Sequence, residues 1–247
     1  MERKGEKEEE DIVCLDGSFF INDNYQLAEF TFGSQVIKLL CLQSASTDFD
    51  LTGQLVWPGA MLLNDYIANN VKLLQGCSVI ELGSGVGITG ILSSRFCHKF
   101  VLTDHNDEVI KILKRNVELH ASKENHNSRA ELMVEKLEWG NSEQICHILE
   151  NHASGFDLIL GADICFQQSS IPLLFRTVKK LLEVRGQGQC KFILAYISRA
   201  KCMDLMVPNE AKQCGLQITE VVGTRRAVSN LEGVIFEVTL QEGLSHF

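Results

Sequence analysis

The sequence lacks several features that would place it in a large class of proteins. It contains no run of about 18 apolar residues, the length that a membrane-spanning helix requires. None of its nine cysteines is spaced C-x-x-C, and its histidines form no H-x-x-x-H pattern, so no zinc site is expected. Residues 1–11 are charged and lack the apolar stretch of a signal peptide, so we expect free thiols in a reducing compartment.

Positive charge is also scarce. Lys and Arg number 23 against 32 Asp and Glu, which gives a formal net charge of −9, and no basic stripe follows any segment. Because phosphate contacts dominate nucleic-acid affinity, no nucleic-acid partner is expected. An acidic surface favours a basic partner, although ordinary solubility explains the same charge. We expect a monomer in the cytoplasm, with the nucleus as a second compartment, that contacts no membrane.

Strand-like and helix-like segments alternate along most of the chain. This alternation predicts an α/β fold, a doubly wound sheet of seven mostly parallel strands with helices on both faces. The last two strands are separated by nine residues, Thr224–Glu232. A parallel crossover needs about a dozen or more, so the last strand should run antiparallel. The expected strands are 77–82, 99–104, 130–137, 156–163, 190–196, 216–223 and 233–240, and the expected helices are 88–97, 107–122, 142–152, 169–184 and 202–214.

The chain is expected to divide into three regions. Residues 1–11 form a charged tail, and residues 12–56 form an N-terminal β segment packed on the core, with a hairpin or meander over 18–42. Residues 57–247 form the main domain. Its first helix should begin at Pro58, because the fixed φ of proline suits the first helical turn.

The segment VIELGSGVGITG follows the first predicted strand of the main domain and fits two ligand-binding patterns. Glu81 with Gly83, Gly85 and Gly87 is typical of S-adenosylmethionine sites, whereas Gly85, Gly87 and Gly90 give the G-x-G-x-x-G of dinucleotide sites. Glycines let the backbone approach a ligand, and the following helix N-terminus favours a negative group. The loop alone therefore indicates a nucleoside-like ligand, without deciding which.

Other residues favour S-adenosylmethionine. A buried Glu81 carboxylate would be costly beside a diphosphate, whereas a sulfonium and an α-ammonium would relieve it. Asp104 ends the second strand and could accept hydrogen bonds from ribose hydroxyls, while Asn106 is better placed to cap the next helix. No tyrosine has a lysine four residues later, as a hydride-transfer enzyme would need for its acid/base chemistry. A nicotinamide enzyme therefore remains a distant alternative.

The motifs V-W-P, L-x-W-G and G-A-D-x-x-aromatic occur in this order, within the stretch from Phe19 to Leu240. This combination resembles the class I, seven-β-strand protein-lysine methyltransferases related to the methyltransferase-like family 21 group. The resemblance implies methyl transfer from S-adenosylmethionine to a lysine of a protein substrate, with S-adenosylhomocysteine as the product. Methylation of protein arginine or histidine, of a nucleic acid or of a small molecule stays open, as does a non-catalytic binding module.

The resemblance also implies roles for individual residues. Asp163 and Phe166 would face the target amine; family members usually carry Tyr where this chain has Phe166, so a role for a phenolic hydroxyl is lost. Trp57 and Trp139 could instead be core aromatics, and Asp163 could cap the next helix. The residues implied to bind the cofactor are Trp57, Glu81, Gly83, Ser84, Gly85, Gly87, Asp104, Trp139 and Ala162.

Overall fold

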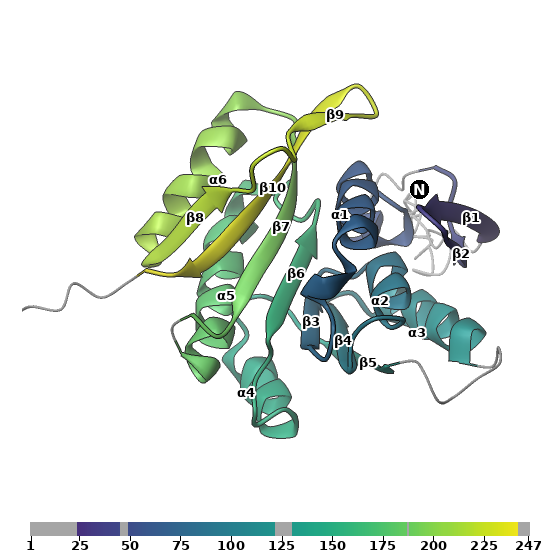
Figure 1. Cartoon of the computed structure of the whole chain (residues 1–247), viewed down its shortest axis with the longest axis horizontal. Helices are drawn as coiled ribbons and strands as arrows, with labels where there is room; N and C mark the ends of the chain where they lie inside the picture. The colour runs from purple at the N-terminus through teal and green to yellow at the C-terminus, as the bar shows by residue number, and fades with distance from the viewer. Residues whose placement is uncertain (1–23, 45–48, 122–129, 187, 242–247) are drawn as a thin grey trace, which may run out of the picture.

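The computed structural model describes residues 24–44, 49–121, 130–186 and 188–241. In this part of the chain, a central eight-stranded sheet carries helices on both faces, and a separate two-stranded hairpin lies beside them (Figure 1). The expected tail at residues 1–11 and the start of the expected meander lie outside the described residues. No helix of the described residues is long and apolar enough to cross a membrane.

The sheet confirms the predicted topology. The strand order is β5-β4-β3-β6-β7-β10-β8, with the short β9 paired to β10. β10 runs antiparallel to β7 and β8, as the short connection before it requires. The strands of the sheet are β3 (Ser78–Leu82), β4 (Lys99–Asp104), β5 (Glu131–Lys136), β6 (Leu158–Ala162), β7 (Lys191–Ser198), β8 (Leu216–Glu220), β9 (Arg226–Val228) and β10 (Leu231–Leu240).

The prediction of seven strands omitted β9. This three-residue strand forms a tight hairpin with the start of β10, through a turn in which Ser229 and Asn230 both have positive φ, 48° and 66°. Such a turn matches the twist of the flanking strands. It was missed because three residues carry too little alternation to predict a strand.

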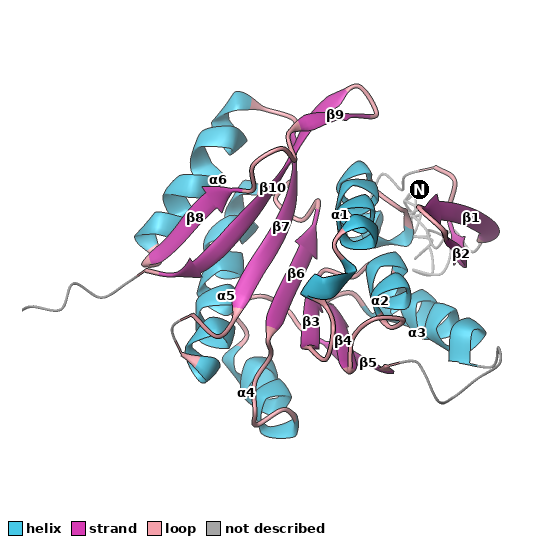
Figure 2. Cartoon of the chain, viewed as in Figure 1, coloured by secondary structure: helices cyan, strands magenta, loops and turns pink. Residues whose placement is uncertain are grey.

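Helices lie in two layers, as Figures 1 and 2 show, with α1, α2 and α3 on one side of the sheet and α4, α5 and α6 on the other. α1 begins at Pro58, as predicted, whereas α2 ends at Ser93, four residues before its predicted end. The α-helices are α1 (Pro58–Asn69), α2 (Ile88–Ser93), α3 (Asp107–Ala121), α4 (Ser142–Asn151), α5 (Ile171–Arg185) and α6 (Lys201–Gln213). Short 3-10 helices are η2 (Phe49–Gln54), η3 (Val71–Leu73) and η4 (Gln168–Ser170).

Each face of the sheet has its own hydrophobic core. Along β3, Val79 packs in the cluster with α1 and α2, whereas Ile80 and Leu82 pack in the cluster with α5. Side chains alternate along a strand, so Glu81 shares the face of Val79. Each fully buried aliphatic side chain contributes about 1.5–3 kcal/mol to the stability of the fold. A carboxylate buried on the same face of β3 is costly unless a partner compensates it.

The N-terminal hairpin packs on the outside of the α1–α3 layer. β1 (Gln26–Phe32) pairs antiparallel with β2 (Gln35–Cys41), within the region where a hairpin or meander was predicted. Asn116 of α3 joins this hairpin to the glycine-rich loop. Its Oδ1 accepts from Leu40 N (2.8 Å), and its Nδ2 donates to Leu40 O and to Val86 O (both 2.9 Å). The chain leaving β2 is therefore held close to that loop.

Candidate functional site

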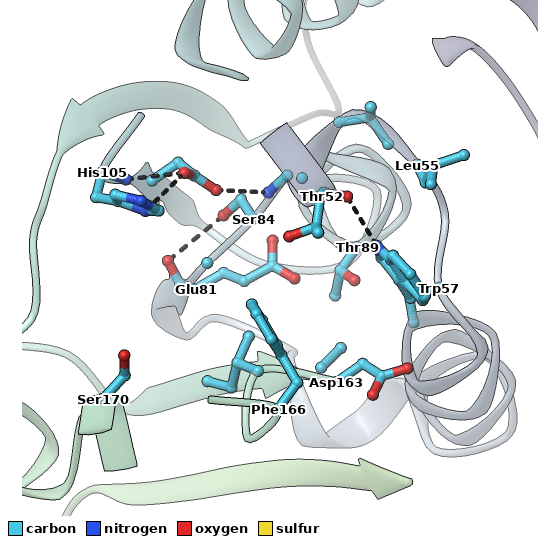
Figure 3. A pocket seen from close by; sticks show the side chains of 18 of the residues that line it. Thr52, Leu55, Trp57, Glu81, Ser84, Thr89, His105, Asp163, Phe166 and Ser170 are labelled. Carbon is cyan, nitrogen blue, oxygen red and sulfur yellow. Dashed lines mark hydrogen bonds and ion pairs between the residues drawn. The ribbon is translucent and has the colours of Figure 1, made fainter. Parts of the chain in front are cut away.

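A cavity of about 600 Å³ opens at the carboxyl ends of β3, β4 and β6 (Figure 3). β3 lies between β4 and β6, so the chain leaves it toward one edge of the sheet and later returns to its other side. Ligands bind at such a switch point in open α/β sheets. Of the site residues named from the sequence, only Gly87 does not line this cavity. Those that line it are Trp57, Glu81, Gly83, Ser84, Gly85, Asp104, Trp139, Ala162, Asp163 and Phe166.

The glycine-rich loop closes one wall of the cavity. Gly85 has a φ of +53°, and a Cβ atom there would lie 2.7 Å from the carbonyl oxygen of Gly53. Segment 52–57, which follows the hairpin, therefore lies directly against the loop. Gly87 does not line the cavity: its φ is +87°, and a Cβ atom would meet Leu113 Cδ1 at 2.5 Å. Both positions need glycine for the turn and for close packing.

Glu81 is a buried carboxyl in the cavity wall. Its side chain is 2 % exposed, and within the described residues Oε2 has no hydrogen-bond partner. Burial raises its pKa to about 8, and nearby Asp104 adds to this shift, whereas the hydroxyls of Thr89 and Ser84 oppose it. The ligand-free protein therefore holds Glu81 mainly protonated at neutral pH. A cationic ligand with N–H donors would supply the missing partner and favour the ionised form.

Asp104 supports the loop from the end of β4. Its Oδ2 accepts from Gly85 N (3.1 Å), and its Oδ1 accepts from His105 N (2.8 Å). The cap of α3 is Asn106, as predicted, because its Oδ1 accepts from Glu108 N (2.8 Å) and Val109 N (3.3 Å). The Asp104 carboxylate thus fixes the loop while it lines the cavity.

Two tryptophans lie on the cavity wall. Figure 3 shows Trp57 on one side of the view, with Glu81 in the middle and His105 on the other side. Trp57 Nε1 donates to the carbonyl of Thr52 (2.8 Å), which fixes the ring against segment 52–57. Trp139 packs against the core on the α5 face and still lines the cavity. Neither ring is simply a core aromatic.

Asp163 follows β6 and is held by two segments that are distant from it in the sequence. Its side chain is 3 % exposed and forms a double ion pair with Arg199, in which Nη2 lies 2.8 Å from Oδ2 and Nη1 contacts Oδ1. Oδ2 also accepts from Gly59 N at the start of α1 (3.0 Å). Asp163 therefore accepts a hydrogen bond from a backbone N–H in the first turn of α1. The sequence had suggested instead that it could cap the helix that follows it in the chain.

Phe166 lies at the outer part of the cavity. Its side chain is 43 % exposed, and Figure 3 shows the ring beside the cavity on the same side as Asp163. Ala162, the last residue of β6, is half-buried and also lines the wall. Phe166 and the Asp163–Arg199 ion pair thus line the same cavity, with Phe166 the more exposed of the two.

Comparison with known proteins assigns this architecture to a family. Residues 38–206 match the family described as lysine methyltransferase. The chain belongs to this family. The protein N-lysine methyltransferase METTL21A of Mus musculus is 30 % identical over 158 residues, which cover 63 % of this chain and 65 % of that protein. Methyltransferase-like protein 22 of Mus musculus is 28 % identical over 62 % of this chain and 41 % of its own length. The chain thus spans less than two thirds of either relative.

Solved structures support the lysine methyltransferase family's fold. A SAM-dependent methyltransferase from Agrobacterium tumefaciens aligns with a TM-score of 0.53 at 15 % identity, covering 87 % of this chain and 70 % of that one. A methyltransferase from Pyrococcus furiosus aligns with a TM-score of 0.50 at 14 % identity, covering 72 % and 82 %. The resemblance to protein-lysine methyltransferases is therefore confirmed at the level of family and fold.

Several residues that line the cavity were not predicted from the sequence. Arg199 lies just after β7, and its charge at a strand end was the signal that could have identified it. Thr52 and Gly53 fall in a stretch without periodicity, where only Gly53 marked a possible close approach. Thr89 lies one residue before Gly90 in α2, and only the structure shows that it lines the cavity.

Proposed function

We propose that this protein is an enzyme that transfers a methyl group from S-adenosylmethionine to the ε-amine of a lysine in a protein substrate. Family membership and the names of its relatives support this proposal. The observation that carries it is the buried Glu81 carboxyl beside the glycine-rich loop, whose Oε2 has no hydrogen-bond partner among the described residues. A phosphate-bearing cofactor would place negative charge near this group, whereas the α-ammonium and sulfonium of S-adenosylmethionine carry positive charge.

The residues of the cavity fit this cofactor. Glu81 would accept from its ammonium, and the backbone from Gly83 to Gly85 would hold its carboxylate near the N-terminus of α2. Asp104 would accept from the ribose hydroxyls, although its Oδ2 already accepts from Gly85 N of the loop and its Oδ1 from His105 N. Trp139 would lie beside the adenine, Trp57 would lie at the methionine end, and Ala162 would contact the cofactor through its backbone.

The other end of the cavity would receive the lysine. The bound cofactor supplies an electrophilic methyl group and a positive charge. A free lysine has a pKa of about 10.4, so the neutral amine must be favoured by desolvation and by nearby positive charge. Asp163 would accept a hydrogen bond from the amine and align it, with its proton passing to water. Phe166 and Trp57 would enclose the alkyl chain.

The proposal also includes the charge of the substrate protein, the oligomeric state and the cellular compartment. The net charge of −9 supports a basic substrate protein. We propose that the enzyme acts as a monomer in the cytoplasm or the nucleus.

Transfer of radiolabelled methyl groups into whole lysate, followed by protease and nuclease digestion, tests the function. We expect protease-sensitive label on lysine, recovered after acid hydrolysis as methyl-lysine. Gly85→Val is the control, because its side chain would strain the positive φ and meet Gly53, so it should neither bind the cofactor nor transfer label. Label on arginine or histidine, or label removed by nuclease, would contradict the proposal, as would cofactor binding without any transfer.

A further inference from the structure

The pair of Arg199 and Asp163 is built into the sheet. These residues follow β7 and β6, which are adjacent parallel strands. Asp163 has a φ of 60°, and its backbone N donates to Ala195 O (2.9 Å). Its carboxylate accepts from Nη1 and Nη2 of Arg199 and from Gly59 N. A carboxylate has about four acceptor sites, so about one remains for a further donor.

Arg199 reaches this position across the cavity wall. Its side chain is 32 % exposed and lines the cavity, and its guanidinium carbon lies 5.6 Å from the centre of the Trp57 ring. The ring and the carboxylate thus hold a planar cation between them. The Asp163 carboxylate also raises the pKa of Arg199, which therefore stays charged.

A charged Asp163 alone would be a poor site for an acceptor amine. A carboxylate within a few ångströms favours the ammonium form, which has no lone pair to attack a methyl group. Beside Arg199 the pair has no net charge, and the remaining lone pair can accept an N–H from a neutral amine. Among the described residues, the other titratable groups that face this part of the molecule are Glu81, Asp104, His105 and Glu138 in the cavity, Cys165 beside Asp163, and Tyr196 and Asp204 near Arg199.

Resting on the proposed function, we propose that Arg199 is a positioning residue of the acceptor site. Its guanidinium, paired with Asp163 and stacked on Trp57, cancels the carboxylate charge so that the site accepts a neutral amine and rejects an ammonium. The Arg199 guanidinium thus already lies over the face of Trp57, one of the two rings that would enclose the substrate.

Methyl transfer into lysate protein, measured from pH 6.5 to pH 10, tests this role. For Arg199→Met we expect at least about a tenfold loss of rate at pH 7, because Asp163 would raise the pKa of the bound amine by about 1–3 units. The loss should become smaller as the pH rises toward 10, because a growing fraction of the amine is then neutral in both proteins. Arg199→Lys should keep the pH profile of the unaltered protein, since it keeps the charge.

Two further variants separate charge from folding. Asp163→Asn combined with Arg199→Met removes both charges, so its pH profile should return toward that of the unaltered protein even if its rate is lower. Arg226→Met removes an exposed arginine paired with Asp65 outside the cavity and should change neither rate nor profile. A loss in Arg199→Met that is equal at every pH would overturn the proposal, because a purely structural role predicts that result.

Binding of n-butylamine gives a readout that does not depend on turnover. With saturating S-adenosylhomocysteine, the unaltered protein should bind n-butylamine more tightly as pH rises from 7 to 10, as followed by NMR. Arg199→Met should bind it best near pH 7, as the ammonium. The same pH dependence in both proteins would refute the role of Arg199, whereas absent methyl transfer with the expected amine binding would refute only the proposed function.

Discussion

Glu81 and Asp163 are both buried carboxyl groups that face one cavity from neighbouring parallel strands, yet their surroundings are opposite. Asp163 has three donors from the protein itself, Nη1 and Nη2 of Arg199 and the N–H of Gly59. Glu81 has an oxygen without a partner in the described structure, and its pKa is raised to about 8. Burial of charge must be compensated in either case. The protein itself pairs the Asp163 carboxylate, whereas burial holds Glu81 mainly protonated at neutral pH, and we propose that a cationic ligand pairs with its ionised form.

The largest effect is expected from removing the Asp163 carboxylate, which is paired with Arg199. Asp163→Ala should lower turnover at least about 100-fold, because the amine loses its aligning acceptor. Cofactor affinity should stay within about threefold, since the other cavity residues are unchanged. The variant should also lose about 2–3 kcal/mol of stability, at the low end for a broken buried pair because Arg199 keeps part of its side chain in solvent.

Steady-state kinetics, calorimetry and chemical unfolding of Asp163→Ala check these three outcomes. Asp65→Ala is the matched control, since Asp65 pairs with Arg226 at the surface and should contribute less than about 1 kcal/mol. Unchanged turnover in Asp163→Ala would show that this carboxylate serves only the fold.

Glu81→Gln should weaken cofactor binding and leave the stability of the ligand-free protein intact, the opposite of the pattern expected for Asp163→Ala. Glu81→Gln keeps the shape of the side chain but cannot form a charged pair with the cofactor's ammonium. We expect cofactor binding about 10- to 100-fold weaker by calorimetry, the range for a lost hydrogen bond to a charged group. The thermal unfolding temperature of the ligand-free variant should not fall at pH 8. A large drop in that temperature would mean that Glu81 is already paired inside the protein.

Stability of the ligand-free protein should depend on pH through Glu81. Its pKa is about 8 in the folded protein and about 4.5 in the unfolded chain, so between these values the folded state holds a proton that the unfolded state has lost. Its contribution is therefore complete below about pH 4.5 and falls by up to about 1.4 kcal/mol for each pH unit up to about 8. Urea unfolding of the protein and of Glu81→Gln, compared from pH 5 to pH 8, isolates this slope. Identical slopes would contradict the raised pKa.

The smallest effect is expected at the mouth of the cavity. Phe166→Tyr restores the residue that the family usually carries, on a ring that is 43 % exposed. Stability should change by less than about 0.5 kcal/mol, as for other surface positions. Turnover should change by no more than a few-fold if the ring only encloses the substrate chain. A gain above about tenfold would instead assign a role to the phenolic hydroxyl.

The sequence predicted the part of the cavity around Glu81 and Asp104 better than the part around Asp163. Glu81 and Asp104 end predicted strands, and Gly85 belongs to a recognisable turn, so the common edge of parallel strands was enough to bring them together. The partner of Asp163 could not be predicted in this way. Arg199 is 36 residues away, and its contact depends on β6 and β7 being neighbours, an order that strand patterns alone do not give.

The remaining differences between the predicted and the observed elements have local causes. β9 is too short to show alternation, and α2 ends early although apolar residues continue past Ser93. The contact of Gly59 N with Asp163 joins the start of α1 to the end of β6, 104 residues later. The roles of the individual cavity residues toward cofactor and lysine stay predictions until the variants are measured.

The amide of Asn116 satisfies three backbone groups, two on Leu40 of the hairpin and one on Val86 of the glycine-rich loop. Rotation or loss of this one side chain would remove the donor to the buried carbonyl of Val86 and to the partly buried carbonyl of Leu40. The Asn116 amide therefore couples the outer hairpin to the wall of the cavity, so a displacement of β2 would also pull on the glycine-rich loop.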